Sequence, residues 1–193
     1  MKRKTVLSLW LALPLLALAF HMGPGQQLVA CDAAAANAAE ARGLVSGNDY
    51  PGAVEAFDAA LAALPAERVD EARRLRLERA KARMLSAELP LAREELVGLL
   101  DELSSSPDRA LVQDVRQALA NSQFYTAWLM RLEGRPRAQW EPEVEASRQH
   151  YRVLAEAAAD APTRAARAAD VEAVVQLARR DLDDLQGLPL PNQ

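Results

Sequence analysis

The sequence predicts an all-α protein. Half of its 193 residues are hydrophobic, yet only 5% are aromatic, and alanine supplies much of the apolar content. Alanine loses no side-chain entropy in a helix, so segments rich in alanine and poor in β-branched residues favour helix over strand. Along most of the chain the apolar residues also recur at the 3.6-residue spacing of a helix that buries one face. The regular placement of proline then locates the helices.

Five prolines each precede a segment with helical periodicity. Proline is tolerated in the first turn of a helix, where its missing N–H would have no partner in any case. We therefore expect each of these prolines to open a helix, with Ser106 as an N-cap before the third of them. The five are Pro51, Pro90, Pro107, Pro142 and Pro162.

Seven helices follow from these signals and from the periodicity. Gly47 and Gly134 are expected to end two of them, because glycine adopts the left-handed conformation at low cost. The short connections predict that consecutive helices are antiparallel neighbours. Residues 187–193 are expected to form a flexible tail. The expected helices span residues 33–46, 51–64, 67–86, 90–103, 108–133, 142–159 and 163–186.

The first thirty residues have the pattern of an export signal. A cationic start, MKRK, is followed by an apolar run over residues 5–20. As a helix, that run would be about 24 Å long, which is short for crossing a bilayer. Residues 1–30 are therefore expected to be an export or lipoprotein signal peptide, with the folded domain over 31–186.

The segment LVAC, residues 28–31, resembles a bacterial lipobox. The resemblance implies cleavage before Cys31, attachment of lipid to its thiol, and residues 32–36 as a short tether. It places the mature protein in the bacterial cell envelope, anchored to a membrane and facing the periplasm. The alternative is ordinary signal cleavage, which would leave a soluble periplasmic or secreted protein. Cys31 is the single cysteine, so no internal disulfide can form.

Three of the expected helices carry the same order of side-chain sizes along one face. A small residue is followed by a larger one four positions later and by a small or medium one after seven. Such a face lets a paired helix approach at the small residue, while the large one fills the groove beside it. The three sets are Ala53, Phe57 and Ala60; Ala92, Leu96 and Leu99; and Ala146, His150 and Val153.

This pattern, with Asp49 and Tyr50 before it and Pro65 after it, resembles the second helix of a tetratricopeptide repeat. The resemblance covers residues 33–160 as about three helix pairs, and residues 163–186 resemble the capping helix of such arrays. It implies a short α-solenoid whose groove binds a protein or peptide, and hence an adaptor. A helical bundle without repeats is the alternative architecture.

The sequence offers few groups for catalysis. His150 is the single histidine outside the signal, and no HExxH motif, cysteine pair or glycine-rich phosphate loop is present. We expect a protein without enzymatic activity, cofactor or metal. The formal net charge of −4, without a basic stripe, also argues against nucleic acid as a partner. The enzymatic alternative is a glycan-acting lyase or hydrolase that uses a buried Glu133 or Glu141.

Aromatic residues and arginines gather in residues 124–151. These residue types dominate protein interfaces because they bury large areas and make directional contacts. One interpretation places the aromatic residues in the core, and the other makes the region a partner-binding site. A purely structural role in an envelope complex is a further alternative to the adaptor. The candidate partner-binding residues are Arg131, Arg135, Arg137, Trp140 and Tyr151.

Overall fold

The structure is a computed structural model that describes residues 24–181. Within this range the protein is all-α, as predicted, with seven helices and no strand. Most of the expected signal peptide, residues 1–23, and the expected tail, residues 187–193, lie outside the described residues. The helices are α2 (Pro24–Ser46), α3 (Tyr50–Ala63), α4 (Val69–Leu85), α5 (Leu89–Glu102), α6 (Arg109–Leu132), α7 (Arg137–Ala157) and α8 (Ala161–Arg179).

The chain divides into two compact units, and the boundary falls inside α4, between Leu75 and Arg76. The sequence predicts one helical domain over residues 31–186, and no glycine- or proline-rich linker lies at this boundary. A division inside a helix leaves no such signal in the composition.

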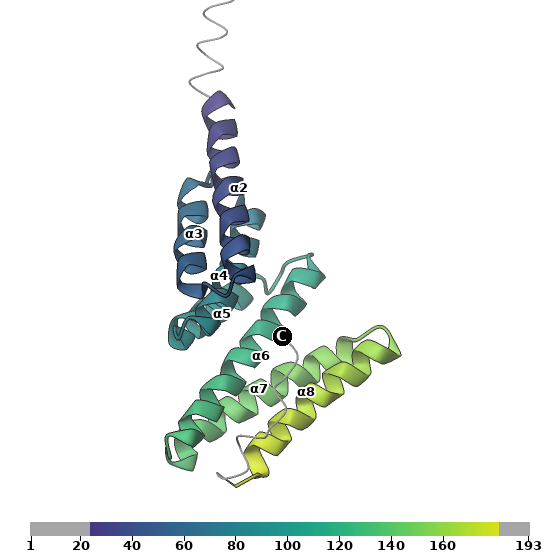
Figure 1. Cartoon of the computed structure of the whole chain (residues 1–193). Coiled ribbons are helices and arrows are strands. Elements are labelled where there is room, and N and C mark those ends of the chain that lie inside the picture. The colour runs from purple at the N-terminus through teal and green to yellow at the C-terminus, as the bar shows by residue number, and fades with distance from the viewer. Residues whose placement is uncertain (1–23, 182–193) are drawn as a thin grey trace, which may run out of the picture. The chain divides into compact units, whose positions relative to one another are not determined.

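In the first unit, α2 and α3 form an antiparallel pair (Figure 1). Alanines on both helices allow the backbones to approach closely, and Phe57, which is 1% exposed, fills the groove beside them. The buried side chains of this pair are Ala34, Ala38, Ala41, Ala53, Val54, Phe57 and Ala60.

The connection between α2 and α3 corrects one prediction. The left-handed residue is Asn48, with φ of 61°, rather than Gly47. The Asn48 N–H donates to the Val45 carbonyl (3.0 Å) and the Asp49 N–H to the Leu44 carbonyl (2.9 Å), which is the Schellman ending of a helix. Asparagine tolerates this conformation better than other residues with a side chain. The Asp49 carboxylate then caps α3 by accepting from the Gly52 N–H (3.1 Å).

The end of α6 agrees with the prediction. Gly134 has φ of 69°, its N–H donates to the Arg131 carbonyl (3.0 Å), and the Arg135 N–H donates to the Met130 carbonyl (2.9 Å). Glycine therefore occupies the left-handed position of a second Schellman motif.

Proline begins helices at three of the five expected places. Pro51, Pro90 and Pro162 occupy one of the first two positions of α3, α5 and α8. Pro107 lies just before α6, whose cap is Asp108 rather than Ser106: the Asp108 carboxylate accepts from the Leu111 N–H (3.0 Å).

Pro142 lies inside a helix, which contradicts the prediction that it opens one. Helix α7 begins five residues earlier, at Arg137, because Gly134 has already turned the chain and Pro136 caps the new helix. Proline at this position removes the N–H that would bond to the Ala138 carbonyl. Ala138 is exposed, so water can satisfy that carbonyl and the helix continues.

Helix α2 also begins earlier than predicted, at Pro24 instead of residue 33. The LVAC segment therefore lies within a helix in this structure. Glutamine, leucine and alanine are favourable helix residues, so the segment before residue 33 can extend the helix. The expected tether, residues 32–36, is already part of the helix pair, because Ala34 is only 1% exposed.

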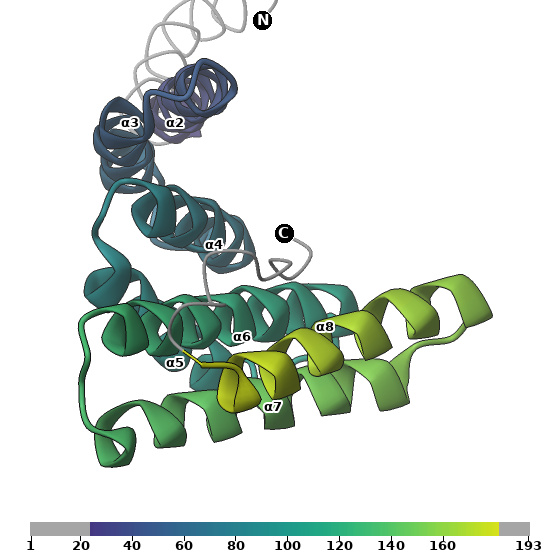
Figure 2. The same cartoon turned by 60° about the horizontal axis from the view of Figure 1, so that its bottom comes forward.

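In the second unit, α5, α6, α7 and α8 pack one against the next, and the last three lie side by side (Figure 2). One core cluster joins the last turns of α4 with α5 and the first half of α6. Its buried members are Leu77, Ala80, Leu96, Leu99, Leu103, Leu111, Val115, Ala118 and Leu119. The other joins the second half of α6 with α7 and α8. It comprises Ala120, Phe124, Ala127, Trp140, Val144, Tyr151, Leu154, Ala173, Val174 and Leu177.

Candidate functional site

The repeated face of α3 and α5 is buried in the register that the sequence suggests. All six residues of the first two sets are at most 1% exposed. In both helices a buried small residue is followed four positions later by a buried larger one, an order that lets one helix pack closely against another. The six are Ala53, Phe57, Ala60, Ala92, Leu96 and Leu99.

The third set is one residue out of register. The buried face of α7 carries Ser147 (0% exposed), Tyr151 (0%) and Leu154 (4%), whereas Ala146, His150 and Val153 are partly exposed. The order of small, large and medium residues is the same, but the small residue is a serine. Its hydroxyl donates to the Ala120 carbonyl of α6 (2.9 Å), which satisfies the polar group inside the core.

His150 consequently lies at the edge of the buried face. Its Nδ1 is 3.2 Å from a guanidinium nitrogen of Arg116 on α6. Burial, and to a smaller extent the Arg116 charge, lower the pKa of His150. Both effects favour the neutral imidazole.

Two of the five candidate partner-binding residues, Trp140 and Tyr151, are buried in the core. Tyr151 is fully buried, and its hydroxyl donates to Asn121 Oδ1 of α6. Burial, and then the nearby Asp170 carboxylate, raise the pKa of Tyr151 well above its ordinary range. Trp140 is 9% exposed and belongs to the core cluster of α6, α7 and α8. Aromatic rings bury more apolar area than any other side chain, and here that area stabilises the fold.

The three arginines of the candidate set have different environments. Arg131 is half-buried, lies 4.8 Å from the centre of the Trp140 ring, and donates to the carbonyls of Leu177 and Arg180 (2.6 Å for the latter). Burial lowers its pKa. This side chain therefore closes the end of α8, whose last carbonyls lack helical partners.

The other two arginines are exposed and paired with neighbouring carboxylates. Arg135 pairs with Glu133 at 3.1 Å and Arg137 with Glu141 at 2.6 Å. Surface pairs of this kind contribute little to stability. The structure also forms a groove of about 310 Å³ between α7 and α8, lined in part by Trp140 and Arg137. The candidate region thus supplies one wall of a shallow groove, with most of its aromatic area turned into the core.

A larger groove lies between α5 and α6. Several residues of the region 124–151 line it, but none of the five candidate partner-binding residues does. We call it the α5/α6 groove; its volume is about 500 Å³. Aromatic, leucine and methionine side chains dominate its lining, and Leu129 is 43% exposed. Beside them, Arg93 and Glu143 form an ion pair at 2.6 Å. Glu133 contributes a further carboxylate, and the apolar and aromatic lining consists of Met84, Ala87, Leu89, Pro90, Tyr125, Trp128, Leu129 and Met130.

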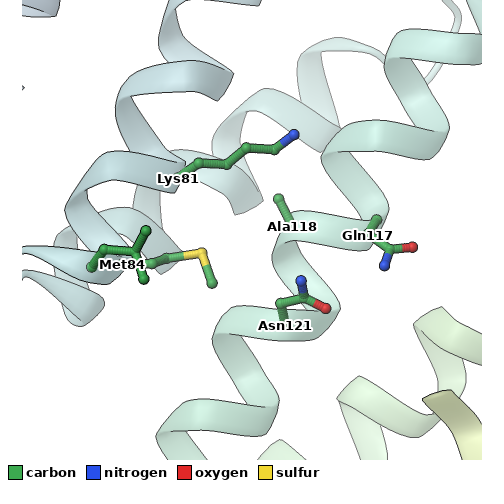
Figure 3. Close-up of a pocket in the computed structure, with 6 residues that line it drawn as sticks. Lys81, Met84, Gln117, Ala118 and Asn121 are labelled. Carbon is green, nitrogen blue, oxygen red and sulfur yellow. The ribbon is translucent and has the colours of Figure 1, made fainter. Parts of the chain in front are cut away.

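A second, smaller pocket lies between α4 and α6 (Figure 3). We call it the Lys81 pocket; its volume is about 80 Å³. Met84 lines both this pocket and the α5/α6 groove, so the two hollows are adjacent. The lining residues are Lys81, Met84, Leu85, Gln117, Ala118 and Asn121.

One signal in the sequence could have indicated these hollows. Helix α6 is apolar on more than one face near its end, in the run YTAWLMRL. Phe124, just before the run, and Ala127 within it are fully buried. Trp128 is half-buried and packs against the core cluster of α6, α7 and α8, whereas Leu129 is 43% exposed. Large apolar residues that remain on the surface often mark a binding site.

Cys31 lies on α2 and is half-buried. The two residues of the LVAC segment that precede Ala30 are exposed, Leu28 by 58% and Val29 by 65%. Large apolar residues so exposed on a helix are unusual for a surface that contacts only water.

Neither carboxylate of the enzymatic alternative is buried. The side chains of Glu133 and Glu141 are 58% and 50% exposed, and each pairs with an arginine. Between residues 24 and 181, no group of three histidine, cysteine or acidic side chains is arranged to hold a metal ion. Over the same residues, none of the helices has the length and hydropathy needed to span a bilayer.

The fold and the two adjacent hollows define an all-α protein with an apolar groove between helices. No known protein-family model matches the chain, and no curated protein or solved structure is significantly similar to it.

Proposed function

We propose that the protein is an exported, lipid-anchored helical-repeat adaptor that binds a protein or peptide partner in the bacterial cell envelope. The observation that carries this proposal is the α5/α6 groove, about 500 Å³ in volume and lined by Tyr125, Trp128 and Met130. Grooves with this lining are typical sites for apolar side chains of a partner, and methionine adapts to different shapes.

The likeness to tetratricopeptide repeats rests on the buried faces of three helices. Each of α3, α5 and α7 presents a small residue, then a larger one after four positions and a small or medium one after seven. An adaptor of this class binds through the surface that its helix pairs leave open rather than through a catalytic centre.

The lipid anchor is proposed on Cys31. For signal cleavage, the bond between Ala30 and Cys31 must leave the helical conformation, because proteolysis favours exposed and irregular segments. The exposed Leu28 and Val29 contribute little packing that would oppose unwinding of this end of α2. Cys31→Ala should move the protein from the membrane fraction to the soluble fraction, and unchanged membrane retention would rule out lipidation here.

Binding by the α5/α6 groove is tested by site-specific photocrosslinking in the host. A photoreactive amino acid at Leu129, which lines the groove, should give a discrete partner adduct. The matched control is Leu91 on α5, which is 50% exposed and does not line the groove. Adducts from Leu91 alone would instead favour a structural subunit that binds through its outer helix faces.

A further inference from the structure

The charged side chains around the α5/α6 groove are already paired with one another. Arg93 binds Glu143 at 2.6 Å, and both residues line the groove. Glu133, which also lines it, pairs with Arg135 at 3.1 Å. An occupant with a charge of either sign would compete with one of these pairs. The groove therefore suits a neutral and apolar segment.

Two aromatic side chains of α6 favour one kind of apolar segment. Tyr125 and Trp128 line the groove together with Pro90 of α5. The Tyr125 ring lies edge-on to the buried Phe124 ring, with their centroids 5.8 Å apart, so the core restrains its orientation. Grooves lined by aromatic rings bind segments in which proline recurs among apolar residues, because such segments lose little conformational entropy on binding.

A segment of this kind, LPLP, occupies residues 188–191 of the chain. It lies beyond the described residues, within the uncharged stretch GLPLPNQ, residues 187–193. Its leucines and prolines provide the neutral, apolar groups that the groove requires.

The end of α8 brings this segment within reach of the groove. Arg131, on the last turn of α6, donates to the Arg180 carbonyl (2.6 Å), so α8 ends beside the end of α6. Leu129, of the same turn, lines the groove. Residues 181–187 can span up to about 23 Å, whereas a helix with its side chains is about 10–12 Å wide. The chain can therefore pass around the end of α6 and place residues 188–191 in the groove.

We propose that residues 188–191 bind in the α5/α6 groove of the same chain, with their leucines against Trp128 and Leu129, and thereby compete with the partner. This inference rests on the proposed adaptor function and specifies how its binding groove is regulated. A segment tethered this closely acts at an effective concentration on the order of 1 mM. The partner must displace the chain's own segment before it can bind.

Photocrosslinking within the purified full chain tests where the segment binds. A photoreactive amino acid at Leu129 should capture the tryptic peptide that starts at Asp181, in a product with the mass of one chain. Trypsin releases this peptide by cleaving after Arg180, because no lysine or arginine follows. The matched control at Leu91, which is similarly exposed but lies outside the groove, should not capture it.

Two results of this crosslinking would overturn the proposal. One is the absence of the peptide from the adducts of Leu129. The other is a product with the mass of two chains, because it would assign the groove to the segment of a second copy.

A peptide probe measures whether the groove is already occupied. The probe is a fluorescent peptide with the sequence of residues 185–193, and its binding is followed by anisotropy. Leu188→Ser combined with Leu190→Ser should let the probe bind about tenfold more tightly than it binds the natural chain, because the tethered competitor is lost. The matched control, Gln186→Ser combined with Asn192→Ser, should bind the probe as the natural chain does. Equal binding to all three proteins would overturn the proposal.

Changes in the groove itself assign the contact. In the variant with both Leu188→Ser and Leu190→Ser, the further change Leu129→Gln should weaken the probe, whereas Leu91→Gln should not. Circular dichroism should show the same helix content in every variant. Equal effects of the two glutamine changes would overturn the assignment to this groove.

Partner capture in the host separates the self-occupied groove from the adaptor function. The change of both Leu188 and Leu190 to serine should increase the partner adduct formed from position 129, because the groove is then open. A partner adduct that does not increase would overturn the regulation and leave the adaptor function standing. Capture of the chain's own segment without any partner adduct would count against the adaptor function and leave the contact standing.

Discussion

The buried faces of the α2/α3 pair and of the α6–α8 core differ in composition. The buried side chains of α2 and α3 are alanines with one valine and one phenylalanine, and they need no hydrogen bonds. In the described part of the chain, all six buried polar or charged side chains belong to the second unit: Gln117, Asn121, Ser122, Gln123, Ser147 and Asp170. The first region depends on shape alone, whereas the second also depends on pairing polar groups that lie far apart in the sequence.

The largest effect should come from the apolar pair. Phe57→Ala should lower the free energy of unfolding by about 3–5 kcal/mol, because the surrounding alanines cannot collapse into the cavity. Denaturant unfolding of the full chain measures the change. Glu55→Ala, an exposed change on the same helix, should stay within about 0.5 kcal/mol. A loss below about 1 kcal/mol for Phe57→Ala would mean that shape does not control this region.

The polar core should respond to the loss of a single hydroxyl group. Tyr151→Phe leaves the buried Asn121 Oδ1 without its hydroxyl donor and should cost about 1–3 kcal/mol. Adding Asn121→Leu should recover part of that loss, because both partners are then apolar. A double-mutant cycle measures the coupling, and simple addition of the two costs would contradict a paired contact.

His150 should make stability depend on pH. Its pKa is lowered in the folded protein, so the unfolded chain binds the proton more readily. The contribution is fully present above about pH 6.5 and is lost as the pH falls through the folded-state pKa, with a slope of at most about 1.4 kcal/mol per pH unit. His150→Gln should reduce the pH dependence of the free energy of unfolding, measured between pH 7 and 5. An unchanged slope would place the titrating group elsewhere.

The smallest change in stability is expected at the helix endings, where two left-handed residues can be compared. Ala87 follows α4 with φ of 66°, a conformation that costs an alanine about 1–2 kcal/mol. Ala87→Gly should therefore stabilise the protein by about 0.5 kcal/mol after the added freedom of the unfolded chain is subtracted. Asn48→Gly, at φ of 61°, should change the thermal midpoint less, since asparagine tolerates this conformation. Equal shifts would contradict this account.

Local signals predicted much of the fold. Gly134, Pro51, Pro90 and Pro162 act on the backbone within a few residues of their own positions, and the structure places them as expected. The prediction that Pro142 opens a helix was wrong, because α7 has already begun at Arg137 and the carbonyl that the proline leaves without a donor, that of Ala138, is exposed.

The face of α7 required information that the local sequence does not carry. From the sequence alone, Ser147 would be placed at the surface, because serine is polar. It is buried because its hydroxyl donates a hydrogen bond to the carbonyl of Ala120 on α6. His150 and Tyr151 are adjacent, so a shift of one residue exchanges the buried ring for the half-exposed one.

The candidate site was predicted only in part. The sequence suggested Trp140 and Tyr151 as partner contacts from their residue type, yet both rings are buried. Lys81 and Met84 carried no motif, because their significance arises where α4 approaches α6. A hollow between helices depends on which side chains stay outside the packed core. The periodicity of the sequence alone does not predict which side chains these are.

The early start of helix packing on α2 has a consequence for an anchored protein. Ala34 is already enclosed by the helix pair, three residues after Cys31, and a helix covers only about 4.5 Å over that distance. A lipid on Cys31 would hold the α2/α3 pair close to the lipid headgroups, because almost no flexible chain separates the lipid from the packed helices. Any molecule that reaches this pair would then have to do so at the bilayer surface itself.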